Sequence, residues 1–422
     1  MGLGFFVFIM KIISLILLFF LFCNSLFSQT VTFNKRLVFG QYAAVLSSLE
    51  TTDSCYYATG IVADQITTTS SIFVKFDTLG NILDTTIFYN VEAWQPTLIT
   101  TLQGNLAVAA YRYDSTVMKT GVLNFNDAGV ILDSSFYTNP YLVGDFIRPD
   151  DLKMTSDSGY IIACTINEPP TQQGGDVSII KTDKNGNLLW HIPKGTAPYN
   201  ESWACLYIED DGYVLGYLQD NLDLVWANYT IRSKLEKIDQ NGNSVWTYQS
   251  PSNQQIWGVN DLIKSKDGGW IVASGWGSEK TINSTTTQAI QESYVYKLDS
   301  GRNFLWGKKF HSDALTTAYF TRVLELEDSS LVAFGTVVRL YPQPNPTYFI
   351  IYGRVVKLSP HGDSLWSREY QYLTTADAQH DIYDAAQTYD GGFLICGGSN
   401  GTGSGPYQQG WLLKLDEHGC LV

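Results

Sequence analysis

The sequence contains few charged residues and no cluster of basic ones. Charged side chains make up 16% of its 422 residues, and the 41 Asp and Glu outnumber the 27 Lys and Arg to give a net charge of −14. Nucleic acids and anionic membrane surfaces attract clustered lysines and arginines. The composition therefore argues against both as partners, while an apolar content of 45% is sufficient for a globular core.

Cysteines are also few, and they show no functional spacing. There are six, and no two of them form a CxxC pair, so the sequence offers neither a zinc spacing nor a disulfide framework. Cys55, Cys164 and Cys396 fall in or beside apolar stretches that resemble strands. We expect these three to be buried thiols.

The short motifs of the common enzyme classes are absent. The sequence has no HExxH zinc motif, no GxSxG nucleophile turn and no phosphate-binding P-loop. Its five histidines form no i, i+4 pair and are expected in solvated loops. Asp183, Asn185 and Asn187 alternate as calcium ligands do, but a later copy of the same turn has Gly301 at the middle position. We therefore expect no metal and no cofactor, and a turn-stabilising role for the aspartate.

What the sequence does contain, at its start, is an apolar segment that predicts export. Residues 12–22 are almost entirely apolar, follow Lys11 and precede a polar break, which is the order typical of a cleaved signal peptide. We expect residues 1–28 to be the signal peptide. The alternative is a transmembrane anchor, but Lys11 divides the apolar run into pieces too short to cross a bilayer of about 30 Å. The protein is thus predicted to be secreted or at the cell surface, without stable membrane insertion.

Two motifs alternate along the rest of the chain. The first, KxDxxGNxLW, is a turn that ends in an aromatic residue, and its copies begin at residues 75, 124, 181, 237, 297, 357 and 414. The second is an acidic glycine turn before an apolar stretch. It is clearest as KDGGWIVASG at 266–275, with copies that begin at residues 52, 102, 156, 210, 327 and 389. Both recur about every 50 to 60 residues, a period typical of propeller blades.

Each repeat predicts four short strands around two tight turns. In the best copy the strands are expected at about 259–265, 270–275, 293–298 and 304–311. Four-stranded units repeated radially form a β-propeller. Because the last copy lacks a fourth strand, we expect the segment 32–40 to close the last blade. The predicted fold for residues 29–422 is an all-β, seven-bladed propeller of four-stranded antiparallel blades.

The KLDxxGNxLW pattern resembles the PQQ-type and related WD40-like repeats of secreted bacterial propellers. In such repeats a tryptophan after the turn packs on the neighbouring blade, and the matching residues here are Trp190, Trp246, Trp306 and Trp366. The resemblance covers the whole mature chain and implies the fold. It implies no cofactor, since the vicinal cysteines and calcium site of PQQ dehydrogenases have no counterpart here. Together with the signal segment, the repeat is similar to secreted propellers of bacteria that use type IX secretion.

Two sets of residues recur where the channel of a propeller is expected. Aromatic residues precede the strand that would line the channel, and these are the predicted binding residues: Trp94, Phe146, Trp203, Trp257, Tyr319 and Tyr383. Acidic residues share one position within that strand, and these are the weak candidates for catalysis: Asp151, Asp261 and Asp384. Two interpretations remain open. The residues could bind a sugar or peptide at the channel mouth, or they could pack between blades and satisfy strand-end amides.

The absence of catalytic motifs favours a non-enzymatic, extracellular propeller. It is expected to be a monomer that recognises a polysaccharide or a protein through the face with the variable loops, or that serves as a scaffold. The alternative is a glycan-degrading hydrolase or lyase with carboxylates at the channel mouth. A quinoprotein oxidoreductase and an outer-membrane assembly scaffold are further alternatives, and the sequence shows neither a cofactor site for the first nor a lipidation site for the second.

Translation is predicted to start at Met10 rather than Met1. Residues 3–9 are apolar and would precede Lys11, whereas signal peptides begin with their positive charge. Mutating the Met10 codon should abolish production of the protein, and mutating the Met1 codon should leave it unchanged, as followed by immunoblotting of cells and medium. Loss of the protein on mutation of the Met1 codon alone would show that the prediction is wrong.

Overall fold

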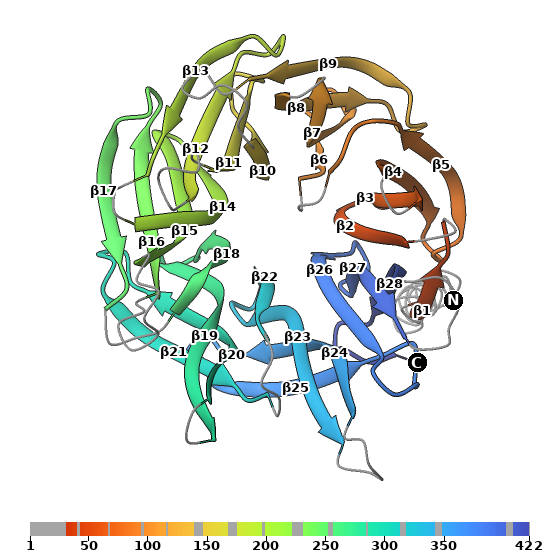
Figure 1. Ribbon diagram of the computed structural model, residues 1–422, viewed down its shortest axis with the longest axis vertical. Coiled ribbons are helices and arrows are strands. Elements are labelled where there is room, and N and C mark those ends of the chain that lie inside the picture. Colours follow the sequence, from red (N-terminus) through yellow and green to blue (C-terminus); the bar gives the residue numbers. More distant parts are fainter. Residues whose placement is uncertain are drawn as a thin grey trace, which may run out of the picture.

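The chain folds into β-sheets arranged around a central axis. The computed structural model describes residues 31–39, 43–65, 68–93, 97–114, 117–138, 147–167, 175–195, 199–221, 231–251, 256–283, 286–312, 318–341, 348–401 and 408–421. Within these ranges the chain forms strands and turns, and no helix has the length and apolarity needed to cross a membrane. The sheets stand side by side as the blades of a β-propeller (Figure 1). The predicted signal peptide, residues 1–28, lies outside the described residues.

Five of the sheets are four-stranded antiparallel blades built from consecutive strands. The first two blades are β2 (Ala43–Thr51), β3 (Cys55–Gln65), β4 (Thr68–Asp77) and β5 (Ile82–Phe88), then β6 (Ile99–Thr100), β7 (Leu106–Asp114), β8 (Val117–Phe125) and β9 (Ile131–Tyr137). The next two are β10 (Ile147–Met154), β11 (Tyr160–Asn167), β12 (Gly175–Thr182) and β13 (Leu188–Pro193), then β14 (Tyr199–Glu209), β15 (Gly212–Asn221), β16 (Ile231–Asp239) and β17 (Ser244–Gln249). The fifth is β18 (Ile256–Lys264), β19 (Trp270–Asn283), β20 (Thr286–Leu298) and β21 (Phe304–Phe310).

The remaining strands form a single eight-stranded sheet. Its order is β1-β28-β27-β26-β24-β23-β22, and β25 pairs with the other side of β24. The strands are β1 (Phe33–Leu37), β22 (Phe320–Glu325), β23 (Leu331–Tyr341), β24 (Tyr348–Leu358), β25 (Ser364–Tyr370), β26 (Gln379–Gln387), β27 (Phe393–Asn400) and β28 (Gln409–Leu415).

The predicted number of seven blades is therefore wrong. Among the described residues there are five four-stranded blades, and the other eight strands are hydrogen-bonded into one sheet. The connection is a parallel pair between Ile351 of β24 and Gln379 of β26, supported by a 2.9 Å hydrogen bond from the Ile351 amide to the Ala378 carbonyl. His380 contributes as well, because its Nδ1 lies 3.1 Å from the Ile351 carbonyl. The repeats in the sequence show how many similar units the chain contains. They cannot show that the sheets of the last two units are joined through the segment before β26.

The two ends of the described chain lie side by side in this sheet. Strand β1 pairs antiparallel with β28, from Phe33 opposite Lys414 to Leu37 opposite Gly410. The side chain of Asn34 accepts a 2.7 Å hydrogen bond from the indole of the fully buried Trp411. This pairing is the one expected of the N-terminal segment, and it covers a sheet edge that would otherwise be open.

In five of the seven repeats the two motifs contact each other within the same repeat. The lysine that begins the first motif forms an ion pair with the aspartate of the second, as in Lys181–Asp157 at 2.9 Å and Lys414–Asp390 at 3.0 Å. Lys75 of the first repeat pairs instead with Asp127 of the next one. The Asp183 carboxylate accepts hydrogen bonds from the amides of Asn185 and Asn187, which confirms its turn-stabilising role. The sequence predicted both turns but not the ion pair between them.

The turn tryptophans pack on the following blade, as the resemblance implied. Trp190 lies 6.5 Å from Tyr213 of β15, and Trp246 lies 6.1 Å from Trp270 of β19, measured between ring centroids. Gly362 must be glycine for two reasons. Its φ is +85°, and an added Cβ would lie 2.7 Å from the ring of Trp306. The hydrophobic core is accordingly divided into clusters between neighbouring sheets, such as Ile161, Ile179, Leu206 and Leu215.

The cysteines and histidines only partly match their expected positions. Cys164 and Cys396 are buried as expected, Cys205 is buried too, and Cys55 is half-buried. The expectation of solvated histidines is wrong for His191 and His380, which are 6% and 0% exposed. Both belong to strands whose neighbours cover them, which the lack of a motif could not reveal.

Stability should fall as the pH is lowered from about 6.5 to about 4, because burial lowers the pKa of His380 to about 4. The ring accepts a hydrogen bond at Nε2 from the Leu373 amide, so the neutral form is required. The unfolded chain takes up the proton first, near pH 6.5, and stability is lost progressively below that pH, by on the order of 3 kcal/mol for this residue. Urea unfolding of His380→Gln should show a smaller loss over this range. The exposed His361→Gln variant should keep the full pH dependence, and equal slopes in both variants would contradict the assignment.

Candidate functional site

The strands nearest the axis share a β-bulge. In six of these inner strands the register with the next strand shifts at one point, and the residue just after the shift is Ser48 in β2, Asp151 in β10, Cys205 in β14, Asp261 in β18, Arg322 in β22 or Asp384 in β26. A bulge adds one residue to its strand and redirects the side chains around it. Polar side chains at these positions reach the neighbouring blade.

The three acidic residues predicted as catalytic candidates all bond the next inner strand. The Oδ2 atoms of Asp151, Asp261 and Asp384 accept hydrogen bonds from the amides of Leu206, Val323 and Leu49, at 2.8, 2.9 and 2.8 Å. All three aspartates are at most 8% exposed. These bonds link neighbouring blades. The aspartates therefore satisfy backbone amides, as the structural interpretation expected, but these amides lie inside the next inner strand and not at a strand end.

Arg322 occupies the same position as these aspartates and is bound by two of them. Its Nε lies 2.5 Å from Oδ1 of Asp384, and its Nη1 lies 3.2 Å from Oδ1 of Asp261. The two carboxylates raise the pKa of Arg322 despite its burial. Asp151 is paired in turn with Lys153 at 2.7 Å. Buried charges at the axis are therefore matched by charges of the opposite sign.

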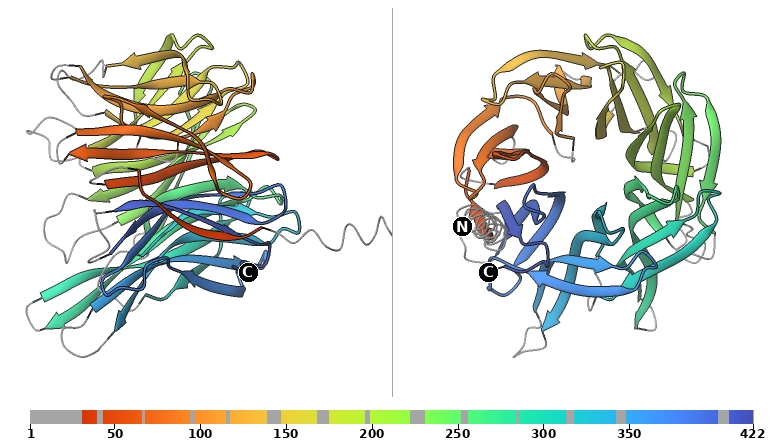
Figure 2. Two further views of the ribbon diagram at one scale, coloured as in Figure 1. Left: turned by 90° about the vertical axis from the view of Figure 1, so that its right-hand side faces the viewer. Right: turned by 180° about the vertical axis from the view of Figure 1, so that it is seen from behind.

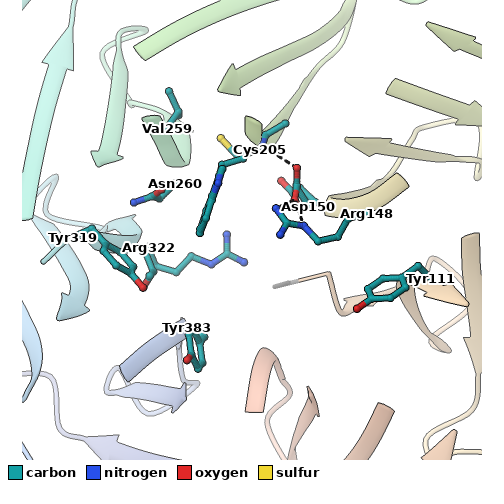
Figure 3. Close-up of a pocket in the computed structure, with 13 residues that line it drawn as sticks. Tyr111, Arg148, Asp150, Cys205, Val259, Asn260, Tyr319, Arg322 and Tyr383 are labelled. Atoms are coloured by element: carbon teal, nitrogen blue, oxygen red, sulfur yellow. Dashed lines mark hydrogen bonds and ion pairs between the residues drawn. The ribbon is translucent and has the colours of Figure 1, made fainter. Parts of the chain in front are cut away.

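A cavity of about 360 Å³ adjoins this charged layer, and Arg322 is among the residues that line it (Figure 3). Its walls come from β7, β10, β14, β18, β22 and β26. Aromatic rings and polar groups both line it, and the residues that define its chemistry are Tyr111, Arg148, Asp150, Trp203, Asn260, Tyr319, Arg322 and Tyr383. A cavity of this size falls in the range of small-molecule sites.

Trp203 is held in an unusual conformation on one wall. Its φ is +60°, which is rare for a bulky residue, and Trp203 is 52% exposed to solvent. The amide of Trp203 donates to Thr165 Oγ1 at 3.1 Å, and the amide of Ala204 donates to Asp150 Oδ2 at 3.2 Å. The guanidinium of Arg148 lies over the indole, 5.6 Å from the ring centroid. The preceding blade thus fixes the position of this indole.

Asp150 is the centre of that arrangement. The same carboxylate accepts hydrogen bonds from Thr165 Oγ1 at 2.5 Å and from Arg148 Nε at 3.2 Å. Burial raises the pKa of Asp150, while the charge of Arg148 opposes that rise. One buried carboxylate therefore joins the arginine and the backbone that carries Trp203.

Two tyrosines form another part of the wall. Burial raises the pKa of Tyr319 and of Tyr383, and the nearby Asp381 carboxylate raises both further, so the phenols remain protonated. Gln408 lies between the acid and the ring, with its Nε2 3.3 Å from the Tyr383 hydroxyl and 3.5 Å from Asp381 Oδ2. Burial raises the pKa of Asp381 from 3.8 to about 6.

The structure brings part of the predicted site together. Trp203, Tyr319, Tyr383 and Asp151 line the cavity, whereas Asp261 and Asp384 reach it only through Arg322. Trp257 is not part of the lining, and its indole lies against Gly277 of its own blade. The predicted binding residues Trp94 and Phe146 lie outside the described residues.

Sequence reasoning missed the charged residues of the cavity. Arg148, Asp150 and Arg322 belong to no motif, and Tyr111 comes from a second strand rather than an inner one. One signal was available for Arg322, which replaces the aspartate of the repeat position. Among the described residues, no group of three or more His, Cys, Asp or Glu side chains could hold a metal ion.

Comparisons with known proteins find similarity only among solved structures. No family model and no curated protein matches the chain. The β-propeller domain of the Trilobed protease from Pyrococcus furiosus aligns with 88% of this chain and 95% of its own at 11% identity, with a TM-score of 0.46. Polysaccharide lyase Uly1 aligns with 88% and 90% at 8% identity and a TM-score of 0.48, and an α-L-arabinanase of Penicillium chrysogenum with 76% and 92% at 12% and 0.41. Such distant similarity carries no argument about ligand or reaction, and the PQQ-type resemblance remains a prediction.

Removing the Asp384 carboxylate should destabilise the protein strongly. Asp384→Ala leaves the Leu49 amide without its acceptor and takes one of the two partners from the buried Arg322, at an expected cost of about 3–5 kcal/mol in the free energy of unfolding. Denaturant titration measures this directly. Asp210→Ala, on the exposed turn after β14, should change stability by less than about 0.5 kcal/mol. Similar small effects of both variants would show that the bulge carboxylate does not stabilise the ring.

Proposed function

We propose that this propeller binds a glycan at the axial cavity without cleaving it. The observation that carries the proposal is Trp203, a half-exposed indole held by the neighbouring blade at a cavity that Tyr319 and Tyr383 also line. Flat aromatic faces and a few fixed polar groups are the usual make-up of small-molecule sites. The cavity is at the small end of the usual range, which suits a short part of a glycan chain. The proposal includes export and an extracellular ligand, as the sequence predicts.

The bonds of the three acidic candidates support binding rather than cleavage. A general acid or base must reach its substrate and exchange a proton with it. The carboxylates of Asp151, Asp261 and Asp384 are instead occupied by a backbone amide of the next blade and by a cationic side chain. Their substitution would first loosen the ring of blades.

A second candidate function is glycan cleavage at the same cavity, and one observation favours it. Asp381 has a pKa raised to about 6, and Gln408 connects it to the hydroxyl of Tyr383, which lines the cavity, whereas Asp381 itself is not part of the lining. A carboxyl group with such a pKa can hold a proton near neutral pH, as a general acid requires. Chromatography of glycans after incubation separates the two functions, since a binding protein releases no products and an Asp381→Asn variant would lose any cleavage.

Replacing the exposed indole should weaken glycan binding. Trp203→Ala is expected to raise the Kd for a bound oligosaccharide by about tenfold or more, because aromatic anchors in a pocket contribute a large share of binding energy. Isothermal titration of residues 29–422 against an oligosaccharide panel measures the effect. Tyr389→Ala is the control, since Tyr389 is 88% exposed on the turn between β26 and β27. No binding to any glycan would overturn the proposal and direct the search to protein partners.

A further inference from the structure

The cationic side chains at the cavity are already paired. Arg148 Nη2 lies 3.1 Å from Asp150 Oδ1, and Arg322 is bound to two carboxylates. Lys153, behind Asp151, is paired at 2.7 Å. Among the described residues that line the cavity and their direct ion-pair partners, three cations face the four carboxylates Asp150, Asp151, Asp261 and Asp384. Each of these cations is therefore paired with at least one carboxylate, and no positive charge is left over at the site.

A site for a carboxylate or sulfate ligand has the opposite arrangement. Such ligands are bound by an arginine whose guanidinium fork is free to form two parallel hydrogen bonds. In this cavity each guanidinium group is bound to a protein carboxylate, so an acidic ligand would have to break a buried ion pair or bind without a cationic partner. Like charges brought together at a binding site cost affinity.

The cavity does offer groups suited to an uncharged ligand. The Trp203 indole provides a flat face, and the Tyr319 hydroxyl has no hydrogen-bond partner among the described residues. Asn260 donates through Nδ2 to the Phe320 carbonyl at 2.8 Å, and its Oδ1 has no partner within the same part of the chain. A neutral sugar has an apolar face for stacking and hydroxyl groups that both donate and accept.

We infer that the cavity selects an uncharged sugar unit over an acidic one, and that Asp150 sets this selectivity by neutralising Arg148. The inference rests on the proposed glycan-binding function and specifies its ligand class. Asp150 also holds the backbone of Trp203 through the Ala204 amide, so it is a positioning residue for the indole as well.

The test compares oligosaccharides that differ only at C6. Two matched pairs serve, namely β-1,4-linked hexamers of glucose and of glucuronate, and α-1,4-linked hexamers of galactose and of galacturonate. Isothermal titration at low salt should give a Kd at least about tenfold lower for the neutral member of the pair that binds. Equal or tighter binding of the acidic member would overturn this inference and leave the proposed function standing. Binding of neither pair would overturn both.

Asp150→Asn tests the residue that sets the selectivity. The amide oxygen can still accept from Thr165 or Ala204, but Arg148 loses its counter-charge, so the preference for the neutral member should fall about tenfold or more. Asp157→Asn is the matched control, because it removes the same charge from a carboxylate beyond the other end of β10, where it pairs with Lys181. An unchanged preference in folded Asp150→Asn, or the same change in both variants, would overturn the role of Asp150.

A second variant keeps the test decisive if Asp150→Asn does not fold. Arg148→Gln removes the cation and leaves the Asp150 carboxylate without it, so the acidic member should bind still more weakly relative to the neutral one. A stronger preference for the acidic member in Arg148→Gln would contradict the inference. Circular dichroism and thermal unfolding establish that each variant is folded before its affinity is compared.

Discussion

The hydrogen bond from the bulge of one inner strand to the backbone of the next is the interaction on which this ring of blades depends. Each blade satisfies its own sheet hydrogen bonds, but its first strand faces the axis with amides that need partners. Asp151, Asp261 and Asp384 supply them across three boundaries, and Ser48 does so across another by accepting from the Leu98 amide at 2.8 Å. Because these bonds are buried, they fix the position of one blade relative to the next as well as stabilising it.

Arg322 shows how a departure from the repeat creates a site. A further aspartate at its position would bring carboxylates together near the axis without a counter-charge, which is costly in a buried environment. The guanidinium instead binds the carboxylates on either side of it, and Arg322 is part of the lining of the cavity (Figure 3). The structural ring and the candidate binding site are therefore one continuous network, with Arg148 and Asp150 at its edge.

The ion pair between the two motifs explains why both motifs recur together along the chain. The lysine of one turn and the aspartate of the other meet in five of the seven repeats, and in each of these the lysine is more deeply buried than the acid, as in Lys414, which is fully buried. Losing either residue would leave the other partner unsatisfied, which accounts for their joint occurrence. The long hairpins β19–β20 and β23–β24 extend beyond the disc on one side (Figure 2), where the pattern of the repeat no longer constrains the sequence.

The sequence by itself determined the β-propeller class, the two turns of each repeat, the tryptophans between blades and the pairing of the terminal strand, because each rests on local patterns of two to ten residues. The fifth blade shows this. All four of its strands form where the sequence predicted them, and the main difference is that the hairpin of β19 and β20 is longer than expected. The sequence also singled out Trp203, Tyr319 and Tyr383, although it expected all three before the inner strand and Trp203 and Tyr383 lie within β14 and β26.

Only the tertiary structure decided how many separate sheets form, which aromatics converge and what the acids do. The join between β24 and β26 depends on one backbone contact across the segment before β26, and nothing in the repeat specifies it. Trp257 and Trp203 occupy comparable places in the sequence, yet only one reaches the cavity. Asp150 and Arg322 acquire their roles from partners about 15 to 60 residues away, and contacts between residues so far apart in the chain leave no local sequence pattern.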